Sequence, residues 1–96
     1  MAASKPDFRT VEVTLGAPFD GWKATMKAEG VPARVFIDLQ SGNVERAMHA
    51  VEKLVVAHNF LTDTGESADS VLDAPMDALT ATITKWSDAV AALPPR

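Results

Sequence analysis

The fold is decided by residues 10–28, which read TVEVTLGAPFDGWKATMKA. Apolar side chains occupy every second position of two runs: Val11, Val13 and Leu15 in the first, and Trp22, Ala24, Met26 and Ala28 in the second. A period of two residues is typical of half-buried strands. Because a Gly- and Pro-containing loop separates the two runs, the segment predicts an N-terminal β-hairpin. A lone hairpin is only marginally stable in water, so its apolar face requires cover from other elements.

The residues directly after the hairpin predict a short helix. Pro32 suits the first turn of a helix, where its missing N–H is not needed. The apolar residues that follow have helical spacing as far as the Ser41-Gly42 break: Val31, Val35, Phe36 and Leu39. A strand through residues 35–37 remains the alternative for this segment.

Two longer amphipathic helices are predicted in the second half of the chain. Asn43 is a suitable N-cap for the first, which is expected to reach His58 or Phe60. Its apolar stripe consists of Val44, Ala47, Met48, Val51, Leu54 and Val55. A polar, acidic loop over residues 61–73 follows, with Asp73 expected to cap the last helix and Pro75 to lie in its first turn. The last stripe consists of Met76, Leu79, Ile83, Trp86, Val90 and Leu93, before Pro94-Pro95.

These elements together predict an α+β fold that is mostly helical. The N-terminal β-hairpin is expected to pack on the short helix and on the two longer amphipathic helices. A length of 96 residues fits one domain, which we expect over residues 10–96. Residues 1–9 are polar and are expected to form a flexible N-terminal tail.

Composition argues against several functional classes. The net charge is −4, and the nine basic residues are scattered, whereas nucleic-acid-binding proteins usually carry a basic stripe. No apolar run is long enough for a transmembrane helix, and the N-terminus lacks the apolar segment of a signal peptide. There is no cysteine, which excludes disulfides, thiol nucleophiles and thiolate zinc sites. The sequence therefore predicts a soluble, cytoplasmic protein that binds other proteins, with no nucleic-acid or membrane partner.

No residue pattern indicates catalysis or ligand binding. His49 and His58 are nine residues apart on the predicted helix and would lie on opposite sides of it, so they do not form a joint metal site. Residues 63–69 lack the alternating oxygen ligands of a calcium loop and predict instead a solvated turn with Gly65 at positive φ. No serine lies in a nucleophile elbow. We therefore expect no catalytic, cofactor or metal site and a protein that is not an enzyme.

Residues 54–66, which read LVVAHNFLTDTGE, carry a family resemblance. They join a predicted long helix to an Asp-x-Gly-Glu turn, and residues 71–75 (VLDAP) then lead into a Trp-bearing last helix. This order resembles the tail assembly chaperones of long-tailed bacteriophages, particularly those of actinobacterial phages and prophages. His58 stands where that family usually has Trp. The resemblance covers roughly residues 20–93.

The resemblance implies a non-enzymatic function in virion assembly, in the cytoplasm of the host cell. Such chaperones bind the long, helical, apolar tape-measure protein, keep it soluble, and help tail-tube protein to polymerise around it. The expected partner-binding residues lie at the edges of the apolar stripes: Val55, Phe60, Leu61, Trp86, Val90 and Leu93. Two alternatives stay open, namely a structural virion protein (a tail-tube or head–tail connector component) and a regulatory or accessory subunit of an enzyme. Self-association also stays open.

Overall fold

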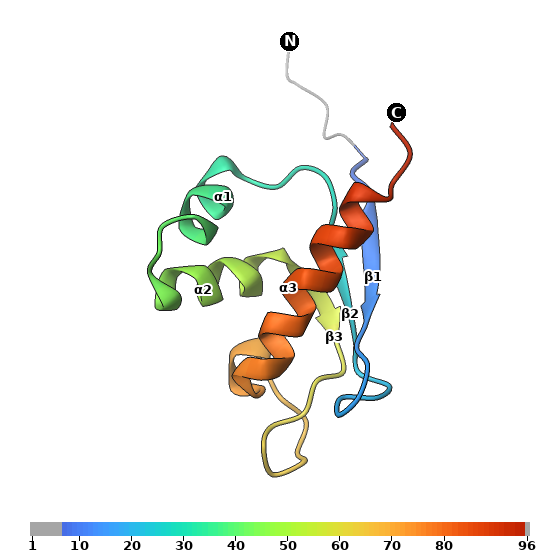
Figure 1. Ribbon diagram of the computed structural model, residues 1–96, viewed down its shortest axis with the longest axis vertical. Coiled ribbons are helices and arrows are strands. Elements are labelled where there is room, and N and C mark those ends of the chain that lie inside the picture. Colours follow the sequence, from blue (N-terminus) through green and yellow to red (C-terminus); the bar gives the residue numbers. More distant parts are fainter. Residues whose placement is uncertain (1–6, 96) are drawn as a thin grey trace.

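A three-stranded antiparallel sheet and three α-helices make up the computed structural model, which describes residues 7–95 (Figure 1). In chain order the elements are β1 (Thr10–Thr14), β2 (Lys23–Lys27), α1 (Ala33–Leu39), α2 (Val44–Leu54), β3 (Val55–His58), a 3-10 turn η1 (Val71–Asp73) and α3 (Met76–Ala91). The sheet order is β1-β2-β3. In Figure 1, α3 crosses the sheet, and α1 and α2 project to one side of both. The predicted α+β class is confirmed.

The predicted hairpin is confirmed, and its alternation sorts the side chains between the core and the solvent. Val13 lies opposite Ala24 in the β1–β2 pairing. Both residues, together with Met26, are at most 2% exposed. The outer face is polar, and Glu12 and Lys23 form an exposed ion pair there at 3.9 Å. Such a pair adds little stability, so the buried face is what fixes the hairpin on the rest of the molecule.

The prediction of one long helix that continues to His58 or Phe60 is wrong. α2 ends at Leu54, and β3 begins at the next residue and pairs antiparallel with β2. Val55 and Val56 are β-branched and therefore favour an extended backbone over a helix. In the extended form, residues 55–58 make backbone hydrogen bonds with the free edge of β2, which a continued helix would not make. The spacing of apolar residues along the sequence does not reveal this pairing, because β2 is distant in the chain.

The short helix α1 is confirmed, and the alternative of a strand through residues 35–37 is not. Val35 is its only buried residue, with 2% exposure. Phe36 and Ile37 are instead exposed, although both are large and apolar.

The last helix is confirmed over residues 76–91, but its predicted cap is wrong. Asp73 belongs to η1, and Pro75 occupies the N-cap position of α3 without a side-chain hydrogen bond. Ser70 makes the side-chain cap in this region, because its Oγ accepts a hydrogen bond of 3.1 Å from the backbone N–H of Leu72. The chain therefore turns twice between the acidic loop and α3, first through η1 and then at Pro75.

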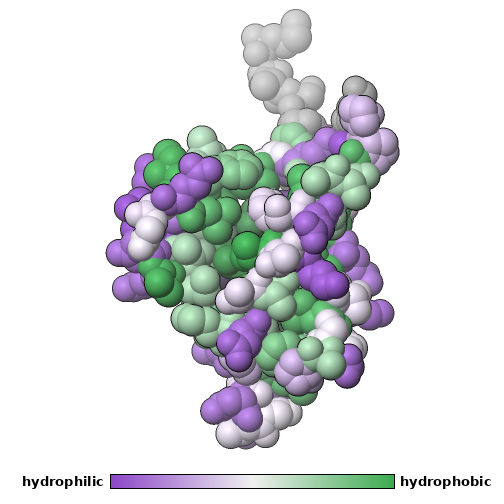
Figure 2. Space-filling view, viewed as in Figure 1, coloured by the Kyte–Doolittle hydropathy of each residue, from purple (hydrophilic) through white to green (hydrophobic). Residues whose placement is uncertain are grey.

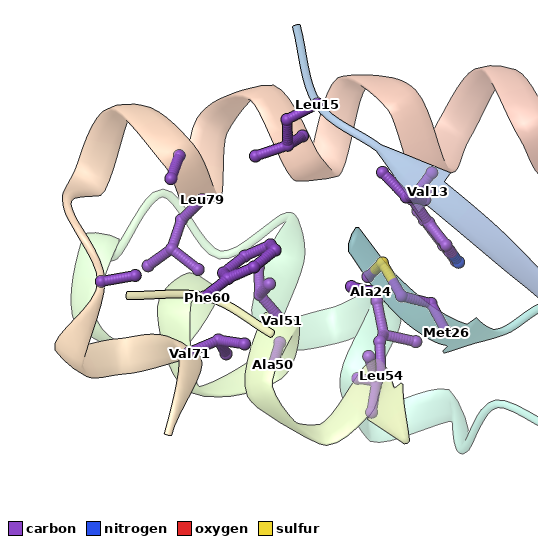
Figure 3. Close-up of a cluster of buried hydrophobic side chains, with 14 residues drawn as sticks. Val13, Leu15, Ala24, Met26, Ala50, Val51, Leu54, Phe60, Val71 and Leu79 are labelled. Carbon is purple, nitrogen blue, oxygen red and sulfur yellow. The ribbon is translucent and has the colours of Figure 1, made fainter. Parts of the chain in front are cut away.

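The core lies between the inner face of the sheet and the helices α2 and α3. Figure 3 shows the ring of Phe60 among the side chains of Val51, Val71 and Leu79. Trp86 of α3 joins the core to the end of the sheet, because its indole Nε1–H donates a hydrogen bond of 2.8 Å to the carbonyl of Lys27. The buried apolar residues are Val13, Leu15, Ala24, Met26, Val35, Ala50, Val51, Leu54, Phe60, Val71, Ala74, Ala78, Leu79 and Trp86.

The predicted N-terminal tail, residues 1–9, is described only from residue 7, and residues 1–6 lie outside the described residues. Arg9 is bound to two other segments. Its backbone N–H donates to a carboxylate oxygen of Glu29 at 2.8 Å, and its guanidinium lies 3.0 Å from the other oxygen. The guanidinium also donates to the carbonyl of Pro94 at 2.9 Å. Arg9 thus connects the start of β1 with the segment after β2 and the segment after α3.

Truncation of two valines in α2 tests where the core lies. Val51 is 0% exposed and Val44 is 61% exposed. Val51→Ala removes two buried methyl groups and leaves a cavity, so we expect it to lower the free energy of unfolding by about 2–3 kcal/mol. Val44→Ala is the matched control and is expected to change stability by less than about 0.5 kcal/mol. Urea denaturation measures both values, and equal losses would contradict this placement of the core.

Candidate protein-binding surface

Four side chains that could support chemistry line one hollow beside β3: Glu52, His58, Asp69 and Ser70. Within residues 7–95, no group of three or more metal-ligating side chains is close enough to hold an ion. His49 is on α2, whereas His58 is on β3, so the two histidines do not share a helix as predicted. The Nδ1 of His58 accepts a hydrogen bond of 3.1 Å from the backbone N–H of Phe60. None of the helices in the described ranges combines the length and apolarity needed to cross a bilayer.

The acidic loop after β3 forms the predicted turn. Gly65 has a φ of 88°, which confirms the expected positive value. The backbone N–H of Gly65 donates to the carbonyl of Thr62 at 3.0 Å, and that of Thr62 donates to the carbonyl of Glu66 at 2.7 Å. The Thr62 hydroxyl supports these bonds, because it accepts a hydrogen bond of 3.3 Å from the backbone N–H of Glu66. The acidic residues of the turn, Asp63 and Glu66, are exposed.

Three surface hollows differ in size and in the residues that line them. Two hollows of about 210 and 190 Å³ flank β3. Both are below the range of about 300–1,000 Å³ that is usual for small-molecule sites. A third, of about 440 Å³, is lined in part by Arg9 and Glu29, whose charges already neutralise each other. The two hollows beside β3 are therefore smaller than a typical small-molecule site.

The residues predicted to bind a partner do not form one surface. Phe60 and Trp86 are 1% and 8% exposed and belong to the core. The remaining four are half-buried: Val55, Leu61, Val90 and Leu93. Leu61 is also far from Val90 and Leu93, because the loop after β3 and the C-terminal end of α3 lie at opposite ends of the molecule in Figure 1.

A different set of apolar residues is exposed, on what we call the helical arm, residues 33–49. Phe36, Ile37 and Val44 on this arm have exposed fractions of 45%, 62% and 61%. Figure 2 shows hydrophobic residues over α1 and near the start of α2, and a hollowed, hydrophobic surface between the arm and α3. The sequence indicates this surface, although the helical spacing of apolar residues does not. Phe36 and Ile37 are consecutive beside the buried Val35, and one narrow helix face cannot bury all three.

Polar interactions hold the two helices of the arm together. The predicted N-cap is confirmed, since Asn43 Oδ1 accepts from the backbone N–H of Arg46 at 3.0 Å. The guanidinium of Arg46 donates through two nitrogens to Asp38 Oδ1, at 2.7 and 3.1 Å. Ser41 Oγ also donates to the carbonyl of Asp38 at 2.8 Å. The arm therefore presents its apolar side chains from a fixed helical hairpin.

Comparisons of the chain with protein-family models, with curated proteins and with solved structures found no match.

Within the segment that carries the family resemblance, Asn59 has a definite structural role. Its Oδ1 accepts from the backbone N–H of Lys23 at 2.7 Å, and its Nδ2 donates to the carbonyl of Gly21 at 3.1 Å. Asn59 therefore joins the end of β3 to the hairpin loop before β2.

Two substitutions of Asn59 separate the contribution of its acceptor, Oδ1, to stability from that of its donor, Nδ2. Asn59→Ala removes both and is expected to lower the free energy of unfolding by about 1 kcal/mol. Asn59→Asp keeps an acceptor for Lys23 but loses the donor to Gly21, so a smaller loss is expected. Urea denaturation of the three proteins measures the difference. If the alanine variant is as stable as the parent protein, Asn59 does not hold β3 to the hairpin.

Proposed function

We propose that this protein is a non-enzymatic phage tail assembly chaperone whose helical arm binds an apolar helical segment of the tape-measure protein. The observation that carries the proposal is the exposure of Phe36, Ile37 and Val44 on one short helical hairpin. Isolated exposed apolar residues are ordinary on protein surfaces. Several on one projecting element are typical of a surface that binds another protein.

The shape of this region suits a helix as the client. Amphipathic helices bind by laying their apolar face into a hydrophobic groove. The hollowed, hydrophobic surface between the arm and α3 has this character (Figure 2). The Arg46–Asp38 pair and the Asn43 N-cap already connect the two helices of the arm, which limits the conformational freedom that is lost when a client binds.

Charge and family resemblance support the finer part of the proposal. A protein that offers apolar surface to a client must not aggregate through the same surface, and a net charge of −4 opposes self-association. The sequence order over residues 54–75 resembles tail assembly chaperones, although residues 55–58 form β3 and not the end of the long helix on which the resemblance is based. In that family the bound client is the tape-measure protein, and binding assists assembly of the tail tube.

The gene neighbourhood gives the first test. We expect a long, helix-rich reading frame with tape-measure character immediately downstream of this gene. Coexpression with that product is expected to raise its soluble yield, measured by fractionation of the lysate. A neighbourhood without such a frame would rule out this client.

Charged substitutions locate the binding surface. Ile37→Asp places a charge on the arm, and Met76→Asp makes the same kind of change at a site of similar exposure at the start of α3, 56% against 62%. If Ile37 is a binding hot spot that contributes about 2 kcal/mol, affinity for a purified tape-measure fragment falls about 30-fold in the first variant. Calorimetric titration measures both variants. Equal affinities would show that the arm is not the client site.

A further inference from the structure

One edge of the sheet is open. β2 is the only strand that pairs with β3 among the described residues. The backbone N–H of Asn59 donates to the carbonyl of Lys23 in β2, at 3.1 Å. Since successive residues of an antiparallel strand direct their backbone groups to opposite sides, those of His58 and Phe60 point away from β2.

The chain itself covers only part of this edge. After the turn at residues 62–66 it runs back beside the end of β3, where Leu61 bridges Ser67 and the N–H of Ala68 donates to the carbonyl of Phe60 at 3.0 Å. It then turns away, because the Ser70 hydroxyl donates to the Glu52 carboxylate and caps η1. The backbone of His58, the next outward-facing position, is left without this cover.

A hollow of about 210 Å³ opens where the two segments separate. It is lined by β3, through Val55, Val56 and His58, by residues 69–71, and by Glu52 of α2. Val56 is 59% exposed and lies where the β2–β3 register shifts. The open edge thus offers unpaired backbone groups next to an exposed apolar side chain, which are the two features that strand addition uses.

Charge decides which occupant suits this edge. Five acidic residues and no basic residue occur between Lys53 and Lys85: Asp63, Glu66, Asp69, Asp73 and Asp77. None of the five forms an ion pair within residues 7–95. Asp69 lines the hollow directly. Pairing of β3 with β3 of a second copy would bring two such acidic segments together, and their repulsion opposes it.

We propose that the outer edge of β3 binds an extended, basic segment of a partner protein as an additional strand. The backbone of the partner pairs with His58, an apolar side chain of the partner contacts Val56, and an adjacent Lys or Arg side chain lies beside Asp69. The site is separate from the helical arm, so the inference does not depend on the identity of the client that binds there.

Three synthetic peptides test strand addition. The probe is Lys-Val-Lys-Val-Lys-Val-Lys; an acidic control has Glu in place of every Lys, and a second control has Pro in place of every Val. The Pro control keeps the charge but removes alternate N–H donors and cannot form a regular strand. At about ten times the dissociation constant of the probe, amide exchange of His58 is expected to slow about tenfold. Neither control is expected to have this effect.

Two charge variants of the full chain test the position of the basic side chain. Asp69→Lys reverses the charge in the hollow, whereas Asp88→Lys makes the same change on the exposed face of α3. We expect the first to weaken binding of the Lys-Val peptide about tenfold at about 0.1 M salt and the second to leave affinity nearly unchanged, since exposed charges more than about 10 Å apart are largely screened at that ionic strength. If Asp69→Lys does not fold, the peptide series on the parent protein alone decides.

The proposal is overturned by any of four results. The first is equal binding of the Pro control, which would show that charge alone causes binding, and the second is protection of backbone amides on the arm and not on β3. The third is a concentration-dependent dimer in which the amide of His58 is protected. The fourth is no binding of the Lys-Val peptide.

Discussion

The rest of the structure depends on β2 being paired along both of its edges. β1 pairs with one edge through the hairpin, and β3 pairs with the other only after the chain has formed α1 and α2. Side chains from other elements secure both ends of this central strand. Asn59 binds the backbone N–H of Lys23 at the start, and Trp86 binds the carbonyl of Lys27 at the end. Because β3 begins opposite Met26, it does not reach the carbonyl of Lys27, and the indole of Trp86 supplies the hydrogen-bond donor there.

This arrangement explains how much of the fold could be predicted from the sequence. The hairpin follows from a period of two residues, which is local and needs no partner outside the segment. The strand β3 could not be read in the same way, because Val55 continues the helical spacing of α2 and only the distant edge of β2 makes the extended form favourable. Long-range pairing of this kind overrides local periodicity.

The same limit applies to the binding surface. Phe60 and Trp86 are predicted at the edges of apolar stripes, yet both are buried. Val71 of η1 lies beside Phe60, and the indole of Trp86 binds the end of β2, and spacing along one helix encodes neither contact. The exposed pair Phe36 and Ile37 could have been found from sequence, because adjacent large residues on a short helix diverge by about 100°. The spacing of residues within one helix can thus reveal an exposed side chain. Whether a residue at the edge of an apolar helix face is buried depends instead on the whole fold.

The two surfaces differ in chemistry, and each is protected from self-association in its own way. The arm is apolar but projects from a chain of net charge −4. The β3 edge carries unpaired backbone groups, which in an unprotected sheet promote aggregation between copies. Its acidic surroundings and the register shift at Val56 oppose that outcome while still admitting a segment of opposite charge.

Because α2 passes into β3 without a connecting residue, the burial of Val51 and Leu54 fixes the arm and the start of the open edge together. An apolar helix on the arm and a basic strand on the edge would therefore be held in a defined relative position by a single buried helix end.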